Sequence, residues 1–376
     1  MRYLNLLIKP ASSCCNMNCE YCFYKDESSN REQYSYGLMD LDTLEVIVKK
    51  AMEECTGVCS FMFQGGEPTI SGLDFYKNLI VLQKRYNKNE IPIFNAIQTN
   101  GYVIDREWAD FFAENKFLVG VSLDGYREIH DTFRKDARLG GTFDRVMETI
   151  RILEARSVDY NILTVVTKPI AEHAREVYEF YREQGFSYLQ FIPCLDEFEK
   201  KRGGSLFSLT PKLYAKFLKE LFDCWYADCL KNDGVSIRNF DNYLMLLQGH
   251  APENCAMSGK CSVNAVIEAD GRVYPCDFYA VDEYCLGNLH EKSYESILSC
   301  ETAKRFASET VIDKRCPRCR YFRLCRGGCR RDKVQDNFGI INYYCESYRS
   351  FFEYTCKRFA IVSAMKTHPY SFMNNK

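Results

Sequence analysis

The chain has 376 residues, which exceeds one ordinary domain and predicts two or three. Its 49 basic and 51 acidic residues give a net charge of −2, which indicates neither nucleic-acid binding nor an acidic substrate. No apolar run approaches the roughly 20 residues of a membrane span, and there is no basic-then-apolar leader. We therefore expect a cytoplasmic protein with no nucleic-acid and no membrane partner.

Short apolar segments alternate with longer amphipathic ones up to about residue 235. The apolar segments predict strands, in chain order, over 4–10, 60–64, 93–99, 118–123, 161–167 and 189–193. Apolar residues at three- and four-residue spacing predict helices over 41–56, 73–86, 105–115, 142–156, 171–184 and 211–231. Six strand–helix units indicate a parallel α/β fold, either a doubly wound sheet or a barrel of six units.

Beyond about residue 235 this alternation ends. Asp270-Gly271 separates two short apolar runs, which predicts a β-hairpin. The aromatic stretch 343–365 predicts a helix. We expect one domain over 1–235, a second over 236–350, and a C-terminal helix and tail over 351–376.

The 20 cysteines form two centres. Four lie between residues 14 and 22 and eleven between 255 and 356, whereas the whole chain has five histidines. Cytoplasmic cysteines remain thiols, so metal or redox chemistry is the better interpretation. The shortage of histidine predicts sites made of thiolates rather than mixed Cys/His zinc sites.

The first centre, Cys15-x3-Cys19-x2-Cys22, directly follows the first predicted strand. Three thiolates can hold three irons of a cubane and leave the fourth iron an open coordination position. Cys14 offers a second interpretation, because Cys14, Cys19 and Cys22 have the spacing of plant-type two-iron ferredoxins. We favour Cys15, since adjacent cysteines cannot both bind one cluster without strain.

The turn Gln64-Gly65-Gly66-Glu67-Pro68 directly follows the second predicted strand. Ligands of parallel α/β proteins bind at the carboxyl ends of the strands, so this turn and the cysteine loop should lie together. Glycines there would let the backbone approach a ligand, and the carboxylate could receive an ammonium group.

Together these motifs resemble the radical S-adenosylmethionine (SAM) superfamily. The resemblance rests on the three-cysteine loop, with Tyr21 before its last cysteine, and on Gly-Gly-Glu-Pro one strand later. It implies a partial (β/α)6 barrel, a [4Fe-4S] cluster on Cys15, Cys19 and Cys22 whose open iron chelates SAM, and a 5′-deoxyadenosyl radical that abstracts a substrate hydrogen. The SAM contacts that it implies are Tyr21, Gly65, Gly66, Glu67, Ser122, Arg134 and Leu195.

The C-terminal cysteines resemble the SPASM domain, an auxiliary-cluster module of peptide-modifying radical enzymes. By itself, Cys316-x2-Cys319-x5-Cys325-x3-Cys329 also fits structural zinc, and the N-terminal motif favours iron–sulfur clusters. The resemblance implies two more [4Fe-4S] clusters, three in all. Their implied ligands are Cys255, Cys261, Cys276 and Cys329 for auxiliary cluster I, and Cys316, Cys319, Cys325 and Cys345 for auxiliary cluster II. Because no iron would remain open, electron transfer is the favoured role.

Further segments resemble the anaerobic sulfatase-maturating enzymes over nearly the whole chain. They span 6–13, 22–24, 63–69, 98–101, 274–279 and 325–331. The resemblance implies oxygen-independent conversion of a Cys or Ser to Cα-formylglycine, within a Cys/Ser-x-Pro/Ala-x-Arg segment of an unfolded or nascent sulfatase polypeptide. It makes Asp277 the general base and implies an electron donor such as flavodoxin or ferredoxin. Tyr24, Gln64 and Gln98 are expected peptide contacts, being polar groups on the expected active face.

Two other functions stay open. Another SPASM peptide maturase, forming thioether or carbon–carbon crosslinks, would share this fold and these clusters. Such enzymes often carry an N-terminal peptide-docking domain, and the chain begins within six residues of its first predicted strand, which disfavours that function. A non-enzymatic electron-transfer or zinc module would need no open iron, so the three-cysteine motif disfavours it as well.

Overall fold

The computed structural model describes residues 1–198, 200–309 and 311–365. They form two compact units that interleave along the chain. The first unit is built from Met1–Ser122, His130–Tyr160 and Ser262–Ser308. The second is built from Leu123–Ile129, Asn161–Cys261 and the described residues after 308. The division at residue 235 stays a prediction.

The first unit contains a sheet in the order β10-β9-β8-β1-β2-β3-β4. Its strands are β1 (Tyr3–Ile8), β2 (Val58–Phe63), β3 (Ile93–Thr99), β4 (Leu118–Ser122), β8 (Ala265–Ile267), β9 (Arg272–Tyr274) and β10 (Gly287–Asn288). Strands β1 to β4 are parallel, and β8 pairs in parallel with β1. The predicted hairpin at Asp270-Gly271 is confirmed, because β8 and β9 pair antiparallel around it and Gly271 has φ +83°. The carboxyl ends of β1, β2 and β3 lead directly into the motifs found in the sequence.

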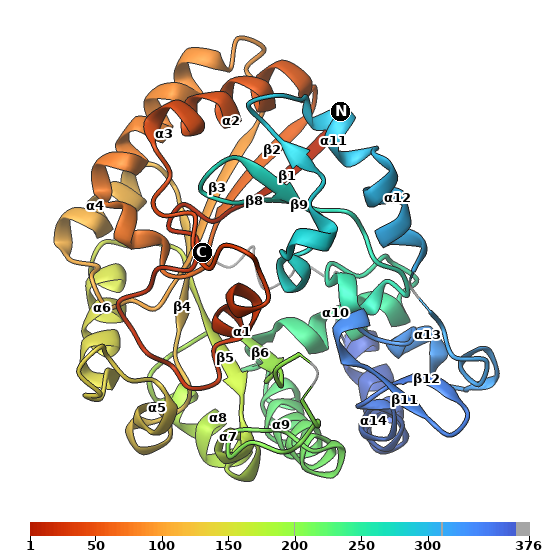
Figure 1. Ribbon diagram of the computed structural model, residues 1–376. Coiled ribbons are helices and arrows are strands. Elements are labelled where there is room, and N and C mark those ends of the chain that lie inside the picture. The colour runs from red at the N-terminus through yellow and green to blue at the C-terminus, as the bar shows by residue number, and fades with distance from the viewer. Residues whose placement is uncertain (199, 310, 366–376) are drawn as a thin grey trace. The chain divides into compact units, whose positions relative to one another are not determined.

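The helices of this unit are α1 (Phe23–Ser29), α2 (Leu41–Glu54), α3 (Leu73–Tyr86), α4 (Arg106–Glu114), α6 (Phe143–Ala155), α11 (Tyr294–Leu298) and α12 (Glu301–Ser308). Helix α2 begins after Asp40, whose carboxylate accepts a hydrogen bond from the Thr43 N–H at 2.7 Å. It buries Leu44, Ile47, Val48 and Ala51, the single stripe that the sequence periodicity predicts. Figure 1 shows α2 and α3 side by side along β1 to β3.

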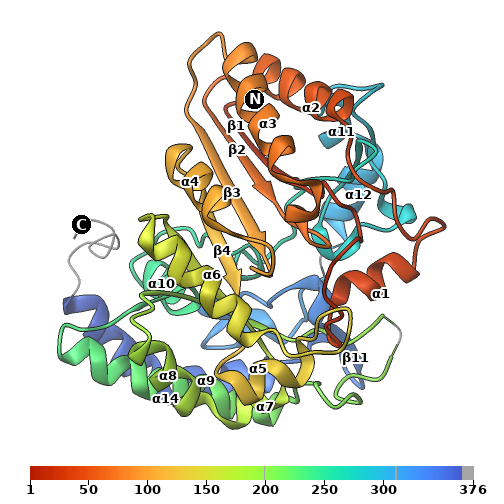
Figure 2. The same cartoon turned by 90° about the vertical axis from the view of Figure 1, so that its left-hand side faces the viewer.

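The second unit contains the parallel strands β5 (Tyr160–Val166), β6 (Tyr188–Pro193) and β7 (Ser236–Ile237), and a separate hairpin of β11 (Lys333–Asp336) and β12 (Gly339–Asn342). Its helices are α7 (Lys168–Glu172), α8 (Ala174–Glu183), α9 (Pro211–Leu230), α10 (Arg238–Leu247), α13 (Phe322–Cys325) and α14 (Cys345–Met365), while α5 (Arg127–Phe133) draws residues from both units. Helices α9 and α14 lie side by side (Figure 2) and pack through aromatic rings, with the Phe222 and Phe359 centroids 4.6 Å apart. The predicted C-terminal helix is thereby confirmed.

All six predicted strands are present, with ends that shift by at most two residues. The helix predicted over 171–184 is divided into α7 and α8 at His173, whose φ of −119° and ψ of 37° are not helical. The end of the α/β pattern near residue 235 was placed too early, because β7 and α10 follow it. Single 3₁₀ turns occur at Pro68–Ser71, Cys255–Met257, Asp277–Tyr279, Asp282–Tyr284, Cys316–Arg318 and Arg330–Asp332. Among the described helices, none is long and apolar enough to cross a membrane.

Candidate active site

The three-cysteine loop follows β1, and its geometry favours one of the two adjacent cysteines as a ligand, an assignment that stays a prediction. The Cys15 thiol has Cys19 and Cys22 as electrostatic neighbours and accepts a hydrogen bond from the Met17 N–H at 3.4 Å. Cys14 turns the other way, and its sulfur lies 3.5 Å from Ser35 Oγ. The structure therefore groups Cys15, and not Cys14, with the other two thiols.

The Cys15 thiol is costly to ionise when no metal is bound. Although Cys15 is exposed as a residue, the loss of water around its sulfur, together with the carboxylate of Glu67 and the neighbouring thiols, raises its pKa to about 12. At neutral pH a thiol with this pKa stays protonated unless a metal takes the place of its proton. The loop thus fits the [4Fe-4S] cluster that the motif implies.

The backbone conformation and the close packing of the Gly-Gly-Glu-Pro turn require both of its glycines. Gly65 and Gly66 have φ of +83° and +54°, which disfavours any other residue. A Cβ on Gly65 would lie 2.5 Å from Lys9 Cγ, and one on Gly66 would lie 2.2 Å from the Cys14 carbonyl oxygen. The Glu67 N–H donates to that same oxygen at 2.8 Å. The turn therefore packs directly on the cysteine loop.

The Glu67 carboxylate is a buried acceptor that joins β2 to β3. Its Oε1 accepts from Thr69 N at 3.1 Å, Thr69 Oγ1 at 2.6 Å and Thr99 Oγ1 at 2.7 Å, and its Oε2 accepts from Asn100 N at 2.7 Å. Burial raises the pKa of this carboxyl, and the four hydrogen bonds oppose the increase. Since the carboxylate is engaged inside the protein, the backbone of this turn is the better candidate for a SAM contact, which stays a prediction.

Three other predicted SAM contacts of this unit, Tyr21, Arg134 and Ser122, are hydrogen-bonded, two of them to each other and one to Gln98. Arg134 is buried and donates to the Tyr21 hydroxyl at 2.9 Å. Gln98 on β3 donates to Ser122 Oγ at the end of β4, at 3.1 Å. Gln98 was expected to contact the peptide, and the structure places it beside Ser122. Leu195 is half-buried after β6, in the second unit.

Asp277 forms a compact group with two of the expected peptide contacts. Its Oδ2 accepts hydrogen bonds from Tyr24 Oη and from Gln64 Nε2, both at 2.8 Å. Its Oδ1 is buried and accepts no hydrogen bond from the residues that the structure describes. Burial raises the pKa of Asp277, partly offset by Lys9 and by the Tyr24 hydrogen bond. An acceptor oxygen left open beside one that is fixed is what a general base requires.

Sequence reasoning missed the charged network beneath this group. Lys9 Nζ lies 2.8 Å from both Glu27 and Glu268, and Arg31 contacts the same two carboxylates. All four side chains are at least 98 % buried. The network joins β1, α1 and the β8–β9 hairpin, and Lys9 also lies 4.8 Å from the Tyr24 ring centroid. It fixes the elements that carry Tyr24 and Asp277. In the sequence, the network is indicated locally by a lysine at the end of an apolar strand.

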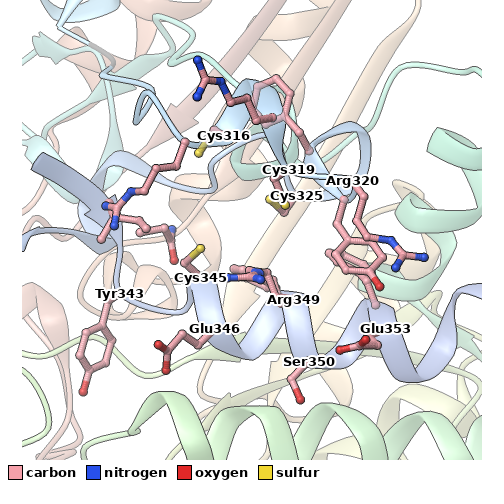
Figure 3. A pocket seen from close by; sticks show the side chains of 18 of the residues that line it. Cys316, Cys319, Arg320, Cys325, Tyr343, Cys345, Glu346, Arg349, Ser350 and Glu353 are labelled. Carbon is pink, nitrogen blue, oxygen red and sulfur yellow. The ribbon is translucent and has the colours of Figure 1, made fainter. Parts of the chain in front are cut away.

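The second unit gathers the four cysteines predicted for auxiliary cluster II. Figure 3 shows their sulfur atoms turned toward one space, within a cavity of about 930 Å³. Burial raises the pKa of Cys325 to about 11, and the three other thiols, Cys316, Cys319 and Cys345, are among its electrostatic neighbours. Because the four sulfur atoms face one cavity, the set fits a four-thiolate cluster.

The ligands predicted for auxiliary cluster I are divided between the two units. Cys329 has Cys255 and Cys261 as electrostatic neighbours in the second unit, and its sulfur accepts from the Arg331 N–H at 3.4 Å. Cys276 belongs to the first unit, directly before Asp277. Across the residues that the structure describes, no three His, Cys, Asp or Glu side chains converge to hold a single metal ion. The assignment of this cluster's ligands stays a prediction.

Comparisons with known proteins identify the family. A model of the radical SAM superfamily matches residues 10–181, and a model of the SPASM iron–sulfur cluster-binding domain matches 255–326. The cysteine-type anaerobic sulfatase-maturating enzyme of Clostridium novyi is 48 % identical over 96 % of this chain and 98 % of its own. The serine-type enzyme of Bacteroides thetaiotaomicron is 31 % identical over 93 % and 89 %.

A solved structure extends the likeness to three dimensions. Native anSMEcpe with bound AdoMet and the Cp18Cys peptide matches with a TM-score of 0.92 at 44 % identity, over 96 % of this chain and 99 % of that one. The predicted fold, a partial radical SAM barrel followed by a SPASM domain, is confirmed. This chain belongs to the anaerobic sulfatase-maturating enzymes of the radical SAM superfamily.

Proposed function

We propose that this chain converts a cysteine of a sulfatase polypeptide to Cα-formylglycine without molecular oxygen. One observation carries the proposal: the Asp277 carboxylate is fixed through one oxygen, has no donor at the other among the described residues, and shares a unit with the three-cysteine loop. A cysteine is the preferred target, because the similarity to cysteine-type relatives, 44–48 % identity, exceeds that to the serine-type enzymes, 30–31 %.

The cofactors are SAM and three [4Fe-4S] clusters, held by the cysteines assigned above. When bound, SAM and its cluster supply a 5′-deoxyadenosyl radical that takes one hydrogen atom from the substrate Cβ. Asp277 receives the thiol proton at Oδ1, while Tyr24 and Gln64 hold Oδ2 in place. The auxiliary clusters would accept one electron from the substrate, and the resulting thioaldehyde reacts with water to give the aldehyde and hydrogen sulfide. The substrate loses two hydrogens, as one hydrogen atom, one proton and one electron.

Two contacts with the peptide follow from this geometry. We expect Tyr24 and Gln64 to lie near the reacting side chain, because both donate to the carboxylate of the proposed base, Asp277. Gln98 lies at the Ser122 end of the site. We propose the cytoplasm as the location, because the substrate is an unfolded or nascent polypeptide and the cluster cysteines must stay reduced.

The proposed function predicts a defined product from a short peptide. The protein, reconstituted anaerobically with iron and sulfide, is expected to convert a Cys-x-Pro-x-Arg peptide to the aldehyde, with one 5′-deoxyadenosine formed per aldehyde. Mass spectrometry of the peptide and chromatography of the nucleoside measure both. A peptide with Ala in place of the cysteine is the matched control. Formation of 5′-deoxyadenosine from iron-loaded enzyme with no change in the peptide would contradict the proposed substrate.

We propose further that an acidic one-electron carrier of the flavodoxin or ferredoxin class docks beside auxiliary cluster II. Segment 314–333 contains nine Lys and Arg and one acidic residue, Asp332, in a chain whose net charge is −2. Arg318 and Arg323 are exposed, and neither pairs with a carboxylate of the described residues. Glu346 and Glu353 line the other side of the same cavity, so the cationic face is the one formed by η5 (Cys316–Arg318) and α13. Complementary charge accelerates the association of such partners.

Charge reversal on this face tests the carrier. Arg318→Glu together with Arg323→Glu is expected to slow electron transfer from reduced flavodoxin about tenfold at low salt and to weaken its dependence on ionic strength. Stopped-flow absorbance of the flavin measures the rate. Lys88→Glu with Arg106→Glu, exposed residues of the first unit, is the control with equal charge change. An unchanged rate in the Arg318/Arg323 variant would exclude this docking face.

A further inference from the structure

A buried asparagine next to the cysteine loop has no role in the reaction described so far. Asn100 directly follows β3 and is 6 % exposed. Its amide nitrogen Nδ2 lies 3.7 Å from Cys15 Sγ and 2.8 Å from Asn16 Oδ1. We propose that Asn100 is a positioning residue whose N–H···S hydrogen bond to Cys15 raises the reduction potential of the cluster on the three-cysteine loop.

The hydrogen-bond network decides which way the Asn100 amide points. Its oxygen Oδ1 accepts from the Tyr102 N–H at 2.9 Å. Only the oxygen can accept, so the NH₂ group is directed toward Cys15 and Asn16. Asn16 Oδ1 offers an acceptor to one N–H, and the second N–H remains for the sulfur.

The backbone of Asn100 is fixed as firmly as its side chain. Its N–H donates to Glu67 Oε2 at 2.7 Å, and Glu67 is held by Thr69 and Thr99. The Glu67 N–H in turn donates to the carbonyl of Cys14, which directly precedes Cys15. The backbone on both sides of the N–H···S contact is thus hydrogen-bonded to Glu67. The Asn100 amide therefore loses little further conformational entropy when it bonds the Cys15 sulfur.

A hydrogen bond to a cluster sulfur matters most when the cluster gains an electron. Reduction adds one negative charge, part of which resides on the thiolate sulfurs, and a donor stabilises that charge. Without the donor, a smaller fraction of the cluster is reduced by a given carrier. This inference rests on the proposed function only in assigning a cluster to Cys15, Cys19 and Cys22.

The test is a redox titration of the three-cluster enzyme followed by electron paramagnetic resonance. The signal that changes on adding SAM reports the three-cysteine cluster, because the auxiliary clusters have no open iron. Asn100→Leu, which removes the donor and keeps a similar volume, is expected to lower the midpoint potential at unchanged iron content. Its SAM cleavage is expected to be slow with flavodoxin and to recover with the stronger reductant titanium(III) citrate.

Asn95→Leu is the matched control on the same strand. Asn95 is 9 % exposed, and its amide pairs with that of Gln83 at 2.9 and 3.1 Å, so the variant loses a buried amide pair and is expected to keep the wild-type potential. Asn100→Asp, a second variant, keeps the side-chain shape and the acceptor for Tyr102, and is expected to lower the potential more than Leu.

Two results would overturn the inference. An unchanged potential in fully loaded Asn100→Leu and Asn100→Asp proteins would show that the amide does not act on the cluster. Loss of iron from both variants would show that Asn100 holds the loop together instead. Failure of the proposed function is a separate outcome, because the wild-type enzyme would then form 5′-deoxyadenosine and leave the peptide unchanged.

Discussion

Replacing Asp277 by Asn is expected to lower formylglycine formation by about 10²–10⁴-fold, the usual contribution of a general base. The amide keeps the shape of the side chain and can still accept from Tyr24 and Gln64. It cannot take the proton from the substrate thiol. SAM cleavage is expected to continue, so the ratio of 5′-deoxyadenosine to aldehyde should rise, measured by chromatography and mass spectrometry of the same reaction.

Asp282→Asn is the control for this prediction. Asp282 follows Asp277 by five residues, and its Oδ2 accepts from the Glu32 N–H at 2.7 Å. An asparagine can preserve that bond, so we expect the wild-type ratio. A normal yield of aldehyde from Asp277→Asn would exclude the carboxylate as the base.

Replacing Cys15 by Ala is expected to abolish SAM cleavage, whereas replacing Cys14 by Ala should leave it near the wild-type rate. The reason is the opposite direction of the two thiols, one facing Cys19 and Cys22 and the other facing Ser35. Three [4Fe-4S] clusters hold about 12 irons, so the Cys15 variant is expected to lose about four of them. Iron analysis and anaerobic 5′-deoxyadenosine formation measure both effects.

Each variant is the control for the other, because each removes one thiol from the same loop. Full activity of Cys15→Ala, or loss of the cluster only from Cys14→Ala, would reverse the assignment. The sequence alone left this choice to an argument about strain between adjacent residues. The structure adds support, because the Cys14 carbonyl accepts from the Glu67 N–H and the Cys14 sulfur lies beside Ser35 Oγ.

The spacing of the apolar residues and the chemistry of short motifs predicted most of the strands and helices. The strands are short apolar runs, and α2 has one apolar stripe behind an Asp N-cap, so a window of a dozen residues contains the necessary information. The cysteine loop and the Gly-Gly-Glu-Pro turn were found for the same reason. Helix α10 was missed because it starts one residue after a two-residue strand and has no side-chain N-cap.

The parts that could not be predicted join distant residues. Lys9 and Glu268 are separated by more than 250 positions, and neither sequence neighbourhood indicates the other. The engagement of Glu67 by Thr99 and Asn100 is of the same kind, since the residues meet only when β2 pairs with β3. Such contacts between residues distant in the sequence decide the protonation and the orientation of the side chains in a site. They can be read from a three-dimensional structure but not from a sequence motif.

The pairing of β1 with β8 has a consequence for how the chain folds. One side of β1 bonds β2, and the other bonds β8, with Leu6 opposite Ala265. During synthesis, β1 to β4 can associate early, but the second edge of β1 stays open until β8, which begins more than 140 residues after the end of β4, has left the ribosome. An open apolar edge is a site for misassociation, and pairing over such a separation is slow. Asp277 lies on the same late segment, so the step that closes the nascent sheet also delivers the proposed base.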